Sequence, residues 1–292
     1  MSRSITFEAI GTHFWIEIFD EISDKELEAT KGRLELLSSV FNEHFSRFRS
    51  DSFISSLNRE RILKNPTEEC RTILTYGKQL YLRSNGSFNL LTGHILEARG
   101  YDANYSFQAT KDVALQPICN PLTDLCISEN EITLTCGNVD LGGYGKGWLI
   151  DTFVSDLKAH SIKHFLVNGG GDMYGTSGKE GGAITIYLEH PTKTGEYLME
   201  TALLNQGFAA SSPFKRQWKS GEKIYDHVVT TGDTPQVATF VKATTSTDAD
   251  AFATVAMLWP EASLPALAEQ ESIAIARFDP LTSQLWQTTN FS

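Results

Sequence analysis

The chain has 292 residues, of which 41% are hydrophobic and 11% aromatic, and its formal net charge is -11 at pH 7. Such a composition supports a sizeable folded core and excludes an intrinsically disordered chain. The negative charge argues against nucleic acid or an anionic membrane surface as the main partner, and no apolar run approaches the length of a membrane span.

The first residues and the cysteines bear on where the protein works. The opening stretch M-S-R-S-I-T-F-E leads directly into an alternating strand pattern and lacks the apolar segment of a signal peptide. Four cysteines stand far apart, without a C-x-x-C motif, at Cys70, Cys119, Cys126 and Cys136. This spacing favours reduced, structural thiols over a zinc site or a disulfide framework, so we expect a cytoplasmic protein.

In chain order, the first predicted elements are two strands and two helices. Alternating apolar residues predict strands at 5–7 and 14–18. Ser23 and Glu26 form a predicted capping box at the start of a helix whose apolar residues recur at helical spacing. A second helix is predicted over 67–84, where it ends before an Asn-Gly pair.

The middle of the chain predicts a β-loop-α-β unit. Residues 131–141 have the pattern of a strand, 148–157 that of a helix and 164–167 that of a second strand. Each strand leads into glycines, which read D-L-G-G-Y-G-K-G at 140–147 and N-G-G-G-D at 168–172.

The last part of the chain mixes strands with a helix. Further strands are predicted at 183–188, 224–229, 237–241 and 272–278, and a late helix over about 247–259. No repeat or low-complexity linker interrupts this order. We therefore expect one α+β domain over residues 1–292.

The glycine loop at 140–147 matches neither standard phosphate-binding loop. A Walker loop needs a hydroxyl residue after its lysine, but Lys146 is followed by Gly147. The dinucleotide fingerprint fails because Trp148 occupies its third glycine position. The loop still allows a close approach of backbone to a ligand, so Lys146 either meets a phosphate or points into water, and Asp140 either binds a ligand hydroxyl or brackets a turn.

The late helix has two interpretations. Asp250 and Thr254 are four residues apart, so their oxygens share one helical face and suit Mg²⁺, which prefers hard oxygen ligands. Alternatively, Thr247 and Asp250 form a capping box and Thr254 faces solvent. Spacing alone favours the cap.

Two further residues are candidates with a structural alternative. His227 follows a predicted strand, where an imidazole can act as a general base or can be a half-buried structural residue. Phe48 in F-S-R-F-R-S can stack on an aromatic ligand, although an aromatic side chain in such a context is more often part of the core.

Read together, the segments resemble the FAD:protein FMN transferase family, also called ApbE. Its landmarks stand in order over nearly the whole chain, and the block D-L-G-G-x-x-K-G-x-x-x-D followed by N-x-G-G-D is the most specific. The segments are I-G-T at 10–12, F-S-R-F-R-S-D-S-F-I-S-S-L-N at 45–58, G-S-F-N-L-L-T-G at 86–93, V-D-L-G-G-Y-G-K-G-W-L-I-D at 139–151, L-V-N-G-G-G-D at 166–172, A-S-S-P at 210–213, D-H-V-V at 226–229 and D-A-D-A-F-A-T at 248–254.

The resemblance implies a fold and a reaction. The fold is an α+β, T-fold-like body of mixed β-sheets packed with helices. The reaction is the Mg²⁺-dependent transfer of the FMN moiety of FAD to a threonine hydroxyl of a target protein, with release of AMP. Hydrolysis of FAD to FMN and AMP, or flavin binding without catalysis, are the alternatives that the same residues allow.

The resemblance also implies roles for single residues. The metal ligands are the main-chain carbonyl of Gly143 and the side chains of Asp250 and Thr254, and His227 takes the proton of the acceptor hydroxyl. The positions that match contacts to FAD are Ile10, Phe48, Phe88, Asn89, Asp140, Lys146 and Val229. The chain departs from the family pattern after the histidine, where it reads H-V-V-T-T-G without the usual Asp-Pro pair.

Overall fold

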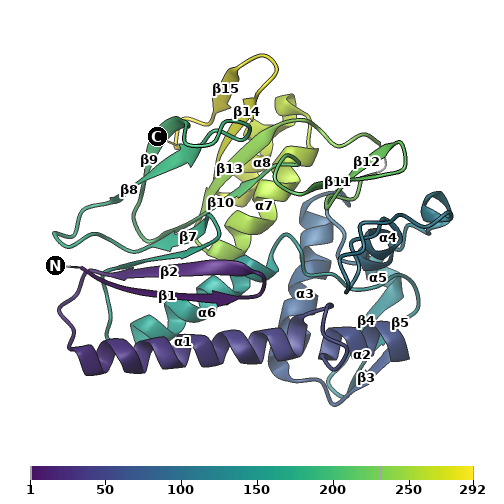
Figure 1. The fold of residues 1–292 in the computed structure, drawn as a ribbon, viewed down its shortest axis with the longest axis horizontal. Helices are drawn as coiled ribbons and strands as arrows, with labels where there is room; N and C mark the ends of the chain where they lie inside the picture. Colours follow the sequence, from purple (N-terminus) through teal and green to yellow (C-terminus); the bar gives the residue numbers. More distant parts are fainter. Residues whose placement is uncertain (1, 231, 292) are drawn as a thin grey trace. The chain divides into compact units, whose positions relative to one another are not determined.

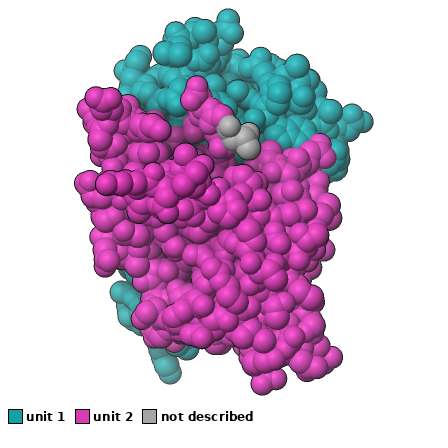
Figure 2. Space-filling view, turned by 90° about the vertical axis from the view of Figure 1, so that its right-hand side faces the viewer, with its two compact units in different colours: residues 1–39, 143–214, 235–292 teal, residues 40–142, 215–234 magenta. Residues whose placement is uncertain are grey.

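The structure is a computed structural model that describes residues 2–230 and 232–291. The chain divides into two compact units, which Figure 2 shows in two colours. Unit 1 comprises Met1–Ser39, Gly143–Phe214 and Pro235–Ser292, and unit 2 comprises Val40–Gly142 and Lys215–Thr234.

Unit 1 is built on an eight-stranded sheet in which every neighbouring pair is antiparallel (Figure 1). The strands follow one another across the sheet in the order β1 (Arg3–Ala9), β2 (Thr12–Ile18), β6 (Phe165–Gly169), β7 (Asp172–Gly175), β10 (Gln206–Ser211), β13 (Ala238–Ala243), β14 (Ala274–Asp279) and β15 (Gln284–Gln287).

The predicted elements at the start of the chain are confirmed. β1 and β2 form a hairpin, and the alternating residues Phe14, Ile16 and Ile18 are fully buried because they share one face of the sheet. The capping box is also present: the Glu26 amide donates to Ser23 Oγ at 3.2 Å, and the Ser23 amide donates to Glu26 Oε2 at 2.8 Å. It starts α1 (Asp24–Phe45), along which the chain passes from unit 1 into unit 2.

Two helices cover one face of the unit 1 sheet. α7 (Ser246–Leu258) packs on β10 and β13, and α6 (Gly145–Ala159) packs on α7 and β7. The hydroxyl of Thr239 in β13 donates to the carbonyl of Ala253 in α7 at 2.6 Å, which fixes the side of β13 that meets the helix. These two helices carry the Gly-Lys-Gly segment and the late Asp-Ala-Asp segment of the sequence.

The opposite face of the sheet is covered by a β-hairpin. β8 (Ile184–Glu189) and β9 (Tyr197–Leu203) form this hairpin, and an apolar cluster lies between it and the sheet. The cluster includes Ile186, Leu188, Leu203, Phe208, Phe240 and Phe291. A short 3-10 helix (Glu261–Ser263) and α8 (Leu264–Glu271) connect α7 to β14.

Unit 2 combines short helices with small sheets. Its helices are the end of α1, α2 (Phe53–Glu60), α3 (Glu68–Arg83), α4 (Gly93–Ala98), a 3-10 turn (Val113–Leu115) and α5 (Pro121–Asp124). A three-stranded sheet has the order β3 (Ile62–Lys64), β5 (Glu131–Leu134), β4 (Leu125–Ile127), and β11 (Gln217–Ser220) pairs with β12 (Lys223–Asp226). Among the described residues, none of the helices has both the length and the apolar character to cross a membrane.

The predicted β-loop-α-β unit at 131–167 is wrong, although the α+β class is confirmed. β5 ends at Leu134 and pairs with β3 and β4 in unit 2, whereas β6 belongs to the large sheet of unit 1. The glycine loop therefore does not follow a strand directly. The strand predicted over 224–229 also ends early, at Asp226.

The expectation of four reduced cysteines is wrong for two of them. Cys119 and Cys136, which are 17 positions apart in the sequence, form a disulfide in unit 2. Cys70 and Cys126 are free, and burial raises the pKa of Cys70 to about 12. Disulfides form and persist mainly in proteins of oxidising compartments.

Candidate functional site

The start of α7 shows which residue caps the helix. Thr245, one residue before the helix, accepts from the amide of Asp248 at 3.1 Å, and its hydroxyl lies 3.3 Å from Asp248 Oδ2. The predicted capping box of Thr247 and Asp250 is therefore wrong. The Asp250 carboxylate is left for other contacts, although the residue is only 6% exposed.

Asp250 takes part in a charge cluster in unit 1 with Asp172, which is also buried, and with the half-buried Lys146. Lys146 Nζ forms an ion pair with Asp172 and lies 3.6 Å from Asp250 Oδ1. The amide of Gly147 donates to Asp250 Oδ2 at 3.1 Å, so the first turn of α6 faces this carboxylate. Asp172 is 2% exposed at the start of β7, which follows the second glycine cluster.

Thr254 lies on α7, which carries Asp250, and Gly143 lies just before α6, which carries Lys146. Thr254 is one helical turn after Asp250, and its Oγ1 is 3.5 Å from Ser211 Oγ at the end of β10. Gly143 precedes α6 and has a φ of +97°, a conformation that a residue with a side chain rarely adopts. This arrangement is consistent with the prediction that Asp250 and Thr254 share one face of α7.

The donor set of the cluster fits a divalent cation. Two carboxylates share one ammonium group, so the cluster has a formal charge of -1 in a largely buried place, which is costly unless a cation or oriented dipoles compensate it. The N-terminus of α6 supplies part of this compensation. Carboxylate, hydroxyl and carbonyl oxygens are the ligands that Mg²⁺ prefers.

Asp151 is the last residue of the D-L-G-G-x-x-K-G-x-x-x-D block, and the sequence assigned it no role of its own. It lies in α6, and its carboxylate accepts from the amides of Ser246 and Thr247 at 2.9 and 2.8 Å and from the Thr247 hydroxyl at 2.6 Å. Burial raises the pKa of Asp151, and the hydrogen bonds from Thr247 and Ser246 oppose that rise. The carboxylate thus joins α6 to the first turn of α7.

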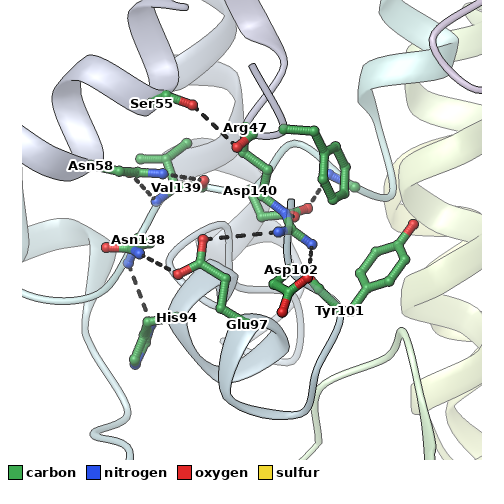
Figure 3. Close-up of polar contacts among 12 residues, drawn as sticks. Arg47, Ser55, Asn58, His94, Glu97, Tyr101, Asp102, Asn138, Val139 and Asp140 are labelled. Atoms are coloured by element: carbon green, nitrogen blue, oxygen red, sulfur yellow. Dashed lines mark hydrogen bonds and ion pairs between the residues drawn. The ribbon is translucent and has the colours of Figure 1, made fainter. Parts of the chain in front are cut away.

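In unit 2, the polar residues gather around Arg47, as Figure 3 shows. The Arg47 side chain is 4% exposed; its guanidinium pairs with Asp140 and donates to the Tyr101 carbonyl at 2.9 Å. It also lies 3.9 Å from Glu97 Oε1 and stacks over the Phe48 ring, 4.2 Å from its centroid. Phe48 and Asp140, two predicted FAD contacts, are therefore linked through one arginine that the sequence analysis did not identify.

Three side chains hold the backbone that leads to Asp140 (Figure 3). Asn58 donates to the Val139 carbonyl at 3.0 Å and accepts from the Val139 amide at 2.7 Å. The Asn138 side chain donates to Glu97 Oε2 at 2.9 Å, and the backbone amide of Asn138 donates to His94 Nδ1 at 3.3 Å. The backbone that leads to Asp140 is thus held at two successive residues, Asn138 and Val139.

Phe88 and Asn89 precede α4 in the same unit. Phe88 is buried, and the Asn89 side chain donates to the Cys119 carbonyl at 2.8 Å and accepts from the Leu91 amide at 2.8 Å. The disulfide therefore fastens the segment that Asn89 touches.

A cluster of aromatic side chains lies beside Phe48. Ring contacts connect its members, which are Tyr101, Tyr105, Phe107, Trp218 and Tyr225.

His227 follows β12 and is half-buried. Arg99 donates to the carbonyls of Val228 at 2.7 Å and Asp226 at 3.4 Å, so it holds the backbone on both sides of the histidine. Val229, the neighbouring candidate, is also half-buried. Ile10 lies in the β1–β2 turn of unit 1 with a φ of 45°.

Sequence comparison places the chain in a known family. The family model described as ApbE family matches residues 10–277. The chain belongs to the ApbE family. Over 163 residues it is 24% identical to a FAD:protein FMN transferase of Rhodobacter capsulatus, a match that covers 54% of this chain and 31% of that relative. The match thus spans about a third of the relative's length.

Solved ApbE structures have the same fold. The apo form of the flavinyl transferase ApbE of Pseudomonas stutzeri superposes with a TM-score of 0.81 at 19% identity, covering 99% of this chain and 96% of that one. The ApbE protein of Thermotoga maritima gives 0.86 at 15% identity, covering 99% and 97%. The flavin transferase ApbE of Vibrio cholerae gives 0.79 at 19% identity, covering 100% and 98%.

Proposed function

We propose that the protein is an FAD:protein FMN transferase, which moves the FMN part of FAD to a threonine hydroxyl of a target protein and releases AMP. Its membership of the ApbE family supports the reaction class. The observation that carries the proposal is the cluster of Lys146, Asp172 and Asp250, because a lysine that can contact a phosphate stands beside buried carboxylates that suit Mg²⁺.

The cluster has the groups that cleavage of a diphosphate requires. Asp250, Thr254 and the carbonyl of Gly143 are the proposed ligands of Mg²⁺, which when bound neutralises charge on the phosphoryl oxygens and on the departing AMP. The Lys146 ammonium is the proposed contact to a phosphate oxygen of FAD. Asp172 holds that ammonium in place through its ion pair.

His227 is the proposed general base. It takes the proton of the threonine hydroxyl while the threonine oxygen attacks the phosphorus of the FMN phosphate. The bond from that phosphorus to the bridging oxygen breaks, and the oxygen leaves with AMP. Arg99 supports this role because it fixes the backbone on both sides of His227.

The other proposed contacts to FAD, besides Lys146, are the positions that match the family's. They are Ile10, Phe48, Phe88, Asn89, Asp140 and Val229. The family match runs through segments of both units, so we propose that residues 1–292 act as one flavin transferase domain.

The cytoplasmic location expected from the sequence stays a prediction, and fractionation of cells that express the protein tests it.

The test is to incubate the protein with FAD, Mg²⁺ and a candidate acceptor protein. We expect AMP by chromatography and an acceptor band that fluoresces on a denaturing gel. AMP and free FMN without acceptor labelling indicate FAD hydrolysis instead. FAD binding without AMP release indicates a flavin-binding protein, and either result overturns the transferase.

A substitution at the proposed base sharpens this test. We expect His227→Ala to abolish FMN transfer while FAD still binds, because the threonine hydroxyl is a weak nucleophile without a base. Equilibrium dialysis with FAD measures the binding, and the fluorescent acceptor measures the transfer. Transfer at the wild-type rate would remove His227 from the mechanism.

A further inference from the structure

We propose that Asp151 is a positioning residue, which ties the first turn of α7 to α6 and so holds Asp250 and Thr254 where a divalent cation can bind. The inference rests on the proposed function, since it gives these two side chains the metal. It concerns a residue that contacts neither FAD nor the metal in that proposal.

The first observation is that Asp151 uses both carboxylate oxygens on the same helix turn. Oδ1 accepts from the Ser246 amide, and Oδ2 accepts from the amide and the hydroxyl of Thr247, with all three distances at or below 2.9 Å. An N-terminal helix turn has amides without intrahelical partners, and here a carboxylate of another helix satisfies two of them.

The second observation is that α7 does not need Asp151 in order to begin. Thr245 already caps the helix in the ordinary way, by accepting from the Asp248 amide. What Asp151 adds is a fixed relation between the two helices. A carboxylate with donors from only one turn sets the position of that turn along α6.

The third observation is that Gly147 makes a second contact one helical turn before Asp151. Residues four apart lie on the same face of a helix, so Gly147 and Asp151 both face α7. The Gly147 amide donates to Asp250, and a Cβ at Gly147 would collide with the Ser246 carbonyl. The helices therefore touch backbone to backbone at Gly147, and Asp151 holds α7 against that contact.

These contacts make the metal ligands depend on Asp151. Asp250 lies one turn after the residues that Asp151 binds, and Thr254 lies one turn further. A loosened first turn would let Asp250 rotate away from the Gly147 amide. Groups that orient metal ligands typically change metal affinity by about 10- to 100-fold when they are removed.

The test compares Asp151→Asn with the control Thr245→Ala, which removes the cap of the same helix. The first readout is the rise in Tm that Mg²⁺ causes, and the second is the Mg²⁺ concentration that half-saturates AMP release from FAD. We expect Asp151→Asn to raise the half-saturating Mg²⁺ in both assays about tenfold, because its amide NH₂ cannot accept from the donors of Ser246 and Thr247. Thr245→Ala should lower Tm but change the Mg²⁺ dependence less than about twofold.

Thr247→Val is the milder variant for the case that Asp151→Asn does not fold. It removes one of the three donors and should shift the Mg²⁺ dependence in the same direction, by less than Asp151→Asn does. Equal Mg²⁺ dependence of the Asp151, Thr247 and Thr245 variants would overturn the positioning role, as would a wild type whose Tm ignores Mg²⁺. A wild type that binds Mg²⁺ but releases no AMP would overturn the transferase only, since the Tm readout still measures Asp151.

Discussion

The two faces of the large sheet in unit 1 bury lysine in opposite ways. On the face covered by α6 and α7, Lys146 is 28% exposed at its side chain and faces two carboxylates. On the hairpin face, Lys242 is 5% exposed, donates to Thr201 Oγ1 at 3.0 Å and lies 5.0 Å from the Phe291 ring centroid. Within residues 2–230 and 232–291, no carboxylate forms an ion pair with Lys242.

This difference distinguishes the charges of the proposed binding site from a buried lysine with no proposed ligand. The first face has one negative charge more than its lysine neutralises, so it favours a further cation. The second face has a single positive charge among apolar side chains, and burial lowers the pKa of Lys242. The same residue type thus belongs to the proposed ligand site in one place, and in the other its charged form is disfavoured by burial.

The largest expected effect comes from removing a carboxylate of the first face. We expect Asp250→Ala to reduce Mg²⁺-dependent AMP release from FAD by at least about 100-fold, since a lost metal ligand costs several kcal/mol of transition-state stabilisation. Chromatography of AMP over a Mg²⁺ series measures the rate. An unchanged rate in this variant, or a wild type indifferent to Mg²⁺, would refute the metal assignment.

Lys146→Met tests the excess negative charge on the same face. Without the ammonium, Asp172 and Asp250 remain buried together, and we expect the free energy of unfolding to fall by about 2 kcal/mol in the absence of metal. Mg²⁺ should then raise the Tm of the variant more than that of the wild type. Chemical denaturation and thermal melts measure the two effects, and a variant as stable as wild type without metal contradicts the account.

Lys242→Met is the matched substitution on the opposite face. Because it replaces a buried, unpaired charge by an apolar chain of similar length, we expect it to raise the free energy of unfolding by about 1 kcal/mol at pH 7. The same denaturation experiment measures it. The comparison fails if both lysine-to-methionine variants change stability in the same direction.

The smallest effect is the pH dependence of Lys242. Its folded-state pKa lies below the unfolded value of about 10.4, so the unfolded chain binds more protons between these two values and stability rises with pH in that window. The advantage of Lys242→Met should therefore shrink as the pH approaches 10. Denaturation of both proteins at a series of pH values measures the difference, and a constant difference would show that Lys242 does not titrate abnormally.

Local patterns in the sequence predicted the elements that depend on neighbouring residues. The alternation of Phe14, Ile16 and Ile18 and the capping box of Ser23 and Glu26 need only a few residues of context. The same holds for the late helix.

Long-range partners were out of reach of such patterns. Three contacts join residues whose spacing in the sequence is not distinctive. They are the ion pair of Lys146 with Asp172, the ion pair of the buried Arg47 side chain with Asp140, and the disulfide of Cys119 with Cys136. A strand was predicted over 131–141, and the structure has β5 over Glu131–Leu134. The sheet to which it belongs was not predicted, because pairing with β3 and β4 depends on the rest of unit 2.

Direct metal binding tests the central claim, that the α6 and α7 face of the sheet holds a divalent cation through Asp250. Electron paramagnetic resonance with Mn²⁺ as the probe compares the wild type with Asp250→Asn, and Lys242→Met serves as the control from the other face. We predict that wild type and Lys242→Met bind one Mn²⁺ alike and that Asp250→Asn loses this binding. Equal binding by all three proteins would contradict the account.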